Sequence, residues 1–128
     1  MSSYKTNCRK SKASFKIPIS FTSGQLWKFE DEVLKSKSGT IWKPEEKWTF
    51  VTAEKNGSIG YIANSGNKDI GLGITGDSVH EVTSYQNDAT QIWKKGEPDR
   101  DGYFTLTSPR SQKVLTAISD QILEIKGE

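Results

Sequence analysis

Short runs of β-branched and aromatic residues, separated by polar turns, dominate the hydrophobic pattern of this chain. No segment keeps the three- and four-residue spacing of apolar positions that an amphipathic helix requires. Gly, Asn, Asp, Ser or Pro bounds most runs, which is typical of strands joined by tight turns. The pattern predicts an all-β protein, with strands over residues 14–19, 25–30, 32–37, 47–53, 58–63, 69–74, 78–83, 90–94, 103–107, 113–118 and 122–126.

A tryptophan motif recurs along these strands. It reads Gln-x-Trp at Trp27 and Trp93, and Glu-x-Trp at Trp48. The stretches that follow the motif also repeat, as Lys113-Val114-Leu115-Thr116, Lys68-Asp69-Ile70-Gly71-Leu72 and Thr40-Ile41-Trp42. Internal repetition indicates the architecture before any single site does. Because large aromatic side chains dominate burial in small domains, we expect the three motif tryptophans to lie together in the core.

This repeat resembles the ricin-type β-trefoil, or R-type lectin-like, domain, and the resemblance covers nearly the whole chain. It implies three lobes of four strands around a pseudo-threefold axis, with the motif tryptophan of each lobe in the core. The expected fold is therefore an all-β β-trefoil with Gln-x-Trp repeats. We expect one β-trefoil domain over residues 14–128, preceded by a basic tail over residues 1–13.

The spacing of the motif indicates that one lobe is shortened. Trp48 and Trp93 stand 45 positions apart, whereas Trp27 and Trp48 stand only 21 apart. Trp42 lies outside the repeat, and we expect it to fill the shortened lobe; the alternative is an exposed stacking platform. Neither end of the chain completes a lobe alone. We therefore expect the strand around Trp27 to pair with the segment beyond Tyr103, which would remove an open sheet edge.

In the family that the chain resembles, a sugar site combines an Asp after the Lys-x-Leu element, an aromatic ring, and an Asn shortly before Gln-x-Trp. Carboxylate and amide groups hydrogen-bond sugar hydroxyls in pairs, while the ring covers the apolar face of the sugar. The matching Asp positions here hold Thr116, Gly71 and Trp42, so the carboxylate is missing from each lobe. The lobe over residues 49–93 keeps full length and contains the tentative carbohydrate-binding residues Gly71, His80, Tyr85, Asn87 and Asp88.

Composition and charge limit the covalent links and the partners that we expect for this chain. The chain has 128 residues, 18 basic and 16 acidic residues, and one cysteine, Cys8, which excludes an internal disulfide. Residues 1–28 carry six basic residues and no acidic one. This tail is either a solvated terminus or an arm that seeks phosphates or membranes; with only Tyr4 to stack on a base among its first 14 residues, we favour the solvated terminus and expect no nucleic-acid partner.

No apolar run approaches the ~18 residues of a membrane span, and no secretory signal follows the first charges. These features predict a protein without a membrane span that is cytoplasmic rather than secreted.

Motifs for catalysis or cofactors are weak. The acidic run that ends at Asp101-Gly102 imitates the start of a calcium loop, but the twelfth position holds Ser108 instead of Glu, so we interpret it as a hairpin turn. His80 is the only histidine and has no marked nucleophile partner. We expect no cofactor, no metal and no enzymatic activity.

The sequence thus leaves two functional hypotheses. The first is a carbohydrate-binding module with a degraded sugar site, whose partner is a glycan or glycoprotein. The second is a protein-interaction module, either an intracellular adaptor or a protease-inhibitor-like trefoil that works through its loops. The missing Asp favours the second hypothesis, and the family resemblance favours the first. The sugar, the protein partner and the oligomeric state stay open.

Overall fold

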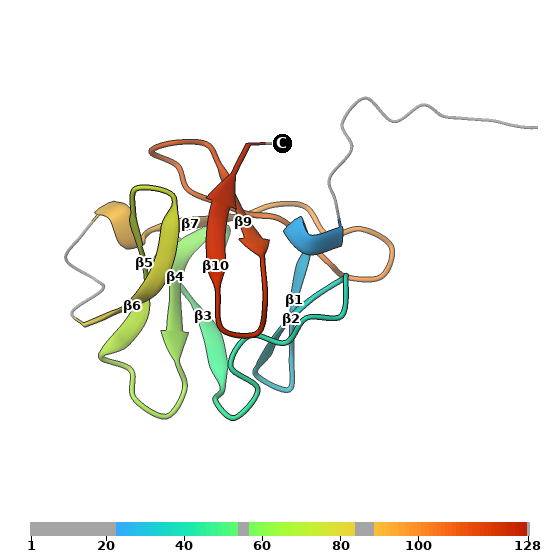
Figure 1. The fold of residues 1–128 in the computed structure, drawn as a ribbon, viewed down its shortest axis with the longest axis horizontal. Helices are drawn as coiled ribbons and strands as arrows, with labels where there is room; N and C mark the ends of the chain where they lie inside the picture. Colours follow the sequence, from blue (N-terminus) through green and yellow to red (C-terminus); the bar gives the residue numbers. More distant parts are fainter. Residues whose placement is uncertain (1–22, 54–56, 84–88, 128) are drawn as a thin grey trace, which may run out of the picture.

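The computed structural model describes residues 23–53, 57–83 and 89–127 (Figure 1). In these ranges the protein is all-β, which confirms the expected class. The strands are β1 (Trp27–Glu30), β2 (Val33–Ser36), β3 (Trp48–Thr52), β4 (Ile59–Asn64), β5 (Ile70–Thr75), β6 (Ser78–Thr83), β7 (Trp93–Lys95), β8 (Leu106–Thr107), β9 (Val114–Ala117) and β10 (Leu123–Lys126). The expected strand over residues 14–19 and the tail over residues 1–13 lie outside the described residues.

Seven strands form a closed, barrel-like ring. Following hydrogen-bonded neighbours, the order is β4, β5, β6, β10, β9, β8 and β7, and β7 pairs again with β4. The closing contact sets Gly60 opposite Trp93. Closure of this kind hides the backbone donors and acceptors that an open sheet edge would expose. β3 pairs along the other side of β4, and β1 and β2 form a separate hairpin beside the ring.

The turn chemistry explains why the hairpins form where they do. Gly76 has a φ of 64° at the first position of the two-residue turn between β5 and β6. A two-residue turn matched to strand twist needs positive φ there, which glycine adopts without steric cost. The turn between β1 and β2 instead places Asp31 and Glu32 at φ values of 54° and 65°, a conformation that residues with side chains adopt less readily.

All three motif tryptophans lie in the core, as expected. Trp27, Trp48 and Trp93 are fully buried and belong to one cluster of buried hydrophobic residues. Leu34, Ile62, Leu72, Leu106 and Leu115 complete the fully buried part of that cluster. Burying rings of this size contributes much of the hydrophobic stabilisation of a small domain.

Backbone contacts of the three tryptophans follow one another in a cycle. Trp48 donates its N–H to the Glu32 carbonyl at 2.6 Å, in the segment that follows Trp27. Trp93 pairs with Gly60, in the segment that follows Trp48. Trp27 and Phe104 exchange two hydrogen bonds of 2.7 and 2.8 Å, and Phe104 follows Trp93. Each tryptophan therefore holds the segment that follows another tryptophan of the cycle.

The expected pairing between the Trp27 strand and the segment beyond Tyr103 is confirmed by the bridge between Trp27 and Phe104. The Trp27 indole N–H also donates to the Leu115 carbonyl at 2.9 Å. Gln25 Nε2 donates to the Gly127 carbonyl at 3.1 Å. Figure 1 accordingly shows η1 (Ser23–Gln25) next to β9, the strand before the last one. The first and last described segments of the chain are thus part of one core.

Trp42 lies in the core rather than serving as an exposed platform. It is 2% exposed, and its ring centroid lies 4.7 Å from that of Trp48. The adjacent Lys43 donates its backbone N–H to the Asp120 carbonyl at 2.8 Å and its Nζ to Glu81 Oε2 at 2.7 Å. The loop at Trp42 is therefore fastened to β6 and to the turn between β9 and β10.

Strands β1 and β7 begin later than predicted because a 3-10 turn precedes each of them. Gln25 and Gln91 end the single-turn 3-10 helices η1 and η3 (Ala89–Gln91), and the strands start at Trp27 and Trp93. Both glutamine side chains are buried, and a hydrophobic pattern does not distinguish such a turn from a strand end. Within the described ranges, no helix has the length and apolarity needed to cross a membrane.

Candidate functional site

Indole hydrogen bonds align two of the repeats. Trp27 Nε1 donates to the Leu115 carbonyl at 2.9 Å, and Trp93 Nε1 donates to the Leu72 carbonyl at 3.1 Å. Leu115 and Leu72 are therefore equivalent. The position that matches Thr116 is then Gly73 rather than Gly71, so the sequence alignment was displaced by two residues. The displacement arose because the sequence comparison matched Lys68 with Lys113, which sets Ile70 opposite Leu115, whereas the indole contact sets Leu72 there.

Neither glycine offers a carboxylate, and the space at Gly73 is already filled. Gly71 is buried in β5, paired with Ala63 on one side and Val82 on the other. A Cβ added at Gly73 would meet Gln91 Cγ at 3.0 Å and the Val82 methyl groups at 3.1 Å. An Asp at position 73 would therefore displace neighbouring side chains.

His80 is the predicted site residue with the clearest geometry. It is exposed on β6, directly across from Gly73, so both lie on one face of the β5–β6 hairpin. Its Nε2 lies 2.6 Å from Thr75 Oγ1, which fixes the plane of the ring. Tyr85, Asn87 and Asp88, predicted to complete the site, lie outside the described residues. The structure thus brings Gly73 and His80 together and leaves the other partners undescribed.

The acidic run near Asp101 is built as a turn. Asp99 Oδ1 accepts the backbone N–H groups of Asp101 and Tyr103 at 2.9 and 3.0 Å, and Asp99 Oδ2 accepts a hydrogen bond from Lys37 Nζ at 2.7 Å. The carboxylate is therefore used for loop geometry and for a lysine. Among the described residues, no group of three or more His, Cys, Asp or Glu could hold a metal ion.

We expect the folded state to hold Asp99 ionised far into the acid range. Its hydrogen bond from Lys37 lowers the pKa from 3.8 to about 2, with smaller contributions from the Tyr103 and Asp101 amides. Because the folded pKa is depressed, the stabilisation is fully present above about pH 4 and is lost as the pH falls towards 2. Carboxyl ¹³C NMR of Lys37→Gln should show a higher Asp99 pKa. Lys35→Gln, which removes a lysine that contacts Glu30 instead, should leave it unchanged.

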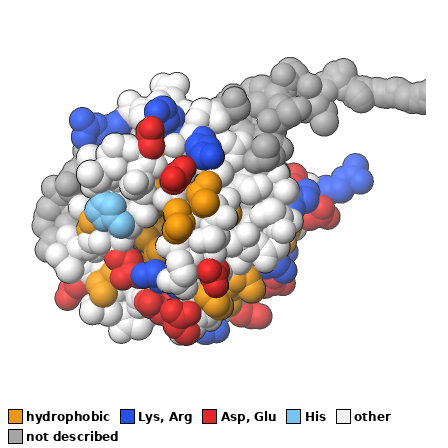
Figure 2. Space-filling view, viewed as in Figure 1, with side chains coloured by type: hydrophobic (Ala, Val, Ile, Leu, Met, Phe, Trp, Pro, Cys, Tyr) orange, Lys and Arg blue, Asp and Glu red, His pale blue; other side chains and the backbone are white. Residues whose placement is uncertain are grey.

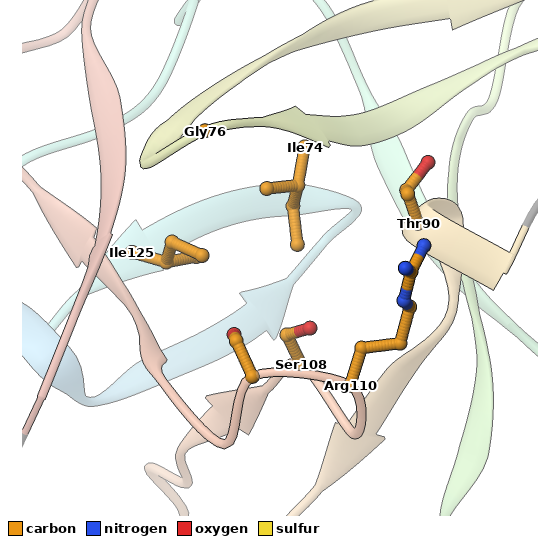
Figure 3. A pocket seen from close by; sticks show the side chains of 7 residues that line it. Ile74, Gly76, Thr90, Ser108, Arg110 and Ile125 are labelled. Atoms are coloured by element: carbon orange, nitrogen blue, oxygen red, sulfur yellow. The ribbon is translucent and has the colours of Figure 1, made fainter.

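A pocket of about 320 Å³ lies on the other face of the β5–β6 hairpin, and the sequence did not indicate it. Figure 3 shows Ile74 and Ile125 pointing into it from one side and Arg110 reaching towards Thr90 on the other. Among the described residues, it is lined by Ile74, Gly76, Thr90, Ser108, Arg110, Ser111 and Ile125. The sequence signal here is Ser108-Pro109-Arg110, whose Ser and Pro are typical of a turn.

Comparison with known proteins adds no relative from which a site could be transferred. No protein-family model, no curated protein and no solved structure matches this chain.

Proposed function

We propose that this chain is a non-enzymatic carbohydrate-binding module of the ricin-type β-trefoil kind, with one shortened lobe. The observation that carries the proposal is the repeated geometry of the tryptophan motif. Trp27 and Trp93 each follow a 3-10 turn that ends in a buried Gln, start a strand, and donate to the carbonyl of an equivalent leucine. The cycle of backbone contacts through Trp48 supports a three-part arrangement.

Support for sugar recognition comes from the surface of the complete lobe. His80 is exposed on β6, and its ring is oriented by Thr75. An exposed, oriented ring suits the apolar face of a sugar, while amide groups take the hydroxyls. We propose Asn87 and Tyr85 as the residues that supply those contacts. Without a carboxylate in the position after Leu72, affinity for neutral sugars should be low.

A glycan array followed by titration calorimetry tests this proposal. We expect saturable binding to a small set of sugars, competed by the free sugar. His80→Ala or Asn87→Ala should weaken it about threefold to tenfold, the effect of one or two ordinary hydrogen bonds. Glu97→Gln changes an exposed loop residue away from β6 and is the control. Binding that survives both alanine variants unchanged would place the sugar elsewhere, and the absence of any glycan ligand would reject the proposal.

The second candidate, a protein-interaction module, is favoured by the turn between β9 and β10. Ile118 and Ile122 flank this turn and are 44% and 52% exposed, the largest exposures among the described large hydrophobic residues. In Figure 2, hydrophobic side chains reach the surface in small groups between charged ones. A projecting apolar turn of this kind suits a protein partner. Retained sugar binding in the double variant Ile118→Ser/Ile122→Ser would separate this surface from glycan recognition.

A further inference from the structure

The pocket that contains Arg110 has walls fixed by hydrogen bonds and an ion pair. Lys113 Nζ lies 2.9 Å from Asp77 Oδ1, which ties the β8–β9 loop to the β5–β6 turn. The Ile125 N–H donates to the Asp77 carbonyl at 2.9 Å and adds β10 to the same wall. In the loop itself, Ser108 donates its N–H to the Lys113 carbonyl and accepts a hydrogen bond from Gln112. The pocket is therefore formed before any ligand arrives.

The positive charge of Arg110 favours an anionic ligand in this pocket. Arg110 is the only charged residue among the described residues that line it, and no ion pair joins Arg110 to a carboxylate of that part of the chain. The Asp77 carboxylate in the adjoining β5–β6 turn is paired with Lys113 rather than with Arg110. A guanidinium group binds a carboxylate or sulfate through two parallel hydrogen bonds, which a lysine cannot match geometrically.

Polar and apolar groups divide the rest of the lining. Thr90 and Ser108 lie beside Arg110, and Ile74 and Ile125 lie on the opposite side (Figure 3). Ser111 adds a third hydroxyl to the lining. Ser108 is 3% exposed, yet it reaches this cavity, and no hydrogen bond joins its hydroxyl to another described residue. Hydroxyls opposite an aliphatic wall match the hydroxyl edge and the C–H face of one sugar ring. A volume of about 320 Å³ limits the ligand to a small molecule.

We propose that this pocket binds a single sugar residue that carries one anionic group, a carboxylate or a sulfate ester, with that group on Arg110. The sugar part of this proposal rests on the carbohydrate-binding function proposed above. The site itself is separate from the His80 surface. Ile74 lines the pocket, whereas Gly73 faces His80, and successive residues of a strand point to opposite faces.

Amide NMR of the full ¹⁵N-labelled chain tests the pocket with a matched pair of ligands. Glucuronate and glucose differ only in the carboxylate, glucose 6-sulfate tests the second anion, and acetate supplies a carboxylate without the ring. We expect glucuronate or glucose 6-sulfate to shift the amides of Gly76, Ser108 and Ser111 at concentrations where glucose and acetate do not. Arg110→Gln should weaken this binding about tenfold to a hundredfold, the range for losing a charged hydrogen bond.

Arg100→Gln is the matched control, because Arg100 is an exposed arginine in another loop and its loss should leave the affinity unchanged. Acetate binding as tightly as glucuronate would overturn the sugar assignment, and glucose binding as tightly would overturn the role of charge. If acidic sugars shift only amides of β6, they bind at the His80 surface and not at Arg110. The proposal for the pocket would then fail, whereas the carbohydrate-binding function would stand. A chain that binds no sugar on an array would reject both proposals.

Discussion

Replacing Trp27 or Trp93 with alanine is expected to remove about 3–5 kcal/mol from the free energy of unfolding. Both side chains are fully buried, and each also donates a buried hydrogen bond, to Leu115 and Leu72 respectively. For a domain of this size the loss is a large share of a total stability of about 5–15 kcal/mol. Urea unfolding followed by far-UV circular dichroism measures it without relying on tryptophan fluorescence.

Phenylalanine variants separate the hydrogen bond from the packing. Trp93→Phe leaves the Leu72 carbonyl without its indole donor, whereas Trp48 Nε1 is buried with no hydrogen-bond partner among the described residues. Trp48→Phe therefore loses ring volume but also removes an unsatisfied donor. We expect it to be less destabilising than Trp93→Phe by about 1–3 kcal/mol. Equal losses would show that the two indole groups are equally well satisfied in solution.

The order of β-branched and turn-forming residues along the chain was sufficient to predict most of the strands. β-branched runs bounded by turn residues identified the hairpin of β5 and β6, and the tryptophan repeat identified three core positions. The 3-10 turns at Gln25 and Gln91 were missed because a buried glutamine imitates a strand position in a simple hydrophobic pattern. β8 was predicted to begin at Tyr103 but begins at Leu106. Phe104 pairs with Trp27 in an isolated bridge instead of extending β8.

The candidate sites were harder to predict because their parts are distant in the sequence. Whether Gly71 or Gly73 matches Thr116 depends on which carbonyl accepts the hydrogen bond from the Trp93 indole N–H. That contact cannot be inferred from the sequence. The Arg110 pocket depends on loop and strand positions from Ile74 to Ile125 that meet only when β6 pairs with β10. The place of His80 on a hairpin strand could be predicted from sequence because that hairpin is local, whereas its role in a site stays a prediction.

A chain that begins at Lys28 is expected not to fold cooperatively. It lacks Trp27, and with it the two backbone hydrogen bonds to Phe104 and the indole hydrogen bond to Leu115. It also lacks Gln25, whose side chain donates to the Gly127 carbonyl. The remaining strands would leave the Leu115 carbonyl unsatisfied and a tryptophan-sized space in the core, which combines two of the costliest defects in a small domain.

The matched control is a chain that begins at Ser23, since it retains every one of these contacts. Differential scanning calorimetry should show a single cooperative transition for this chain and none for the chain that begins at Lys28. In the full-length chain, Gln25→Ala alone should cost only about 0.5–1.5 kcal/mol, because it removes one hydrogen bond and little packing. A cooperative transition in the shorter chain would contradict closure of the core by the Trp27 strand. Loss of the transition in both chains would instead assign a structural role to residues 1–22.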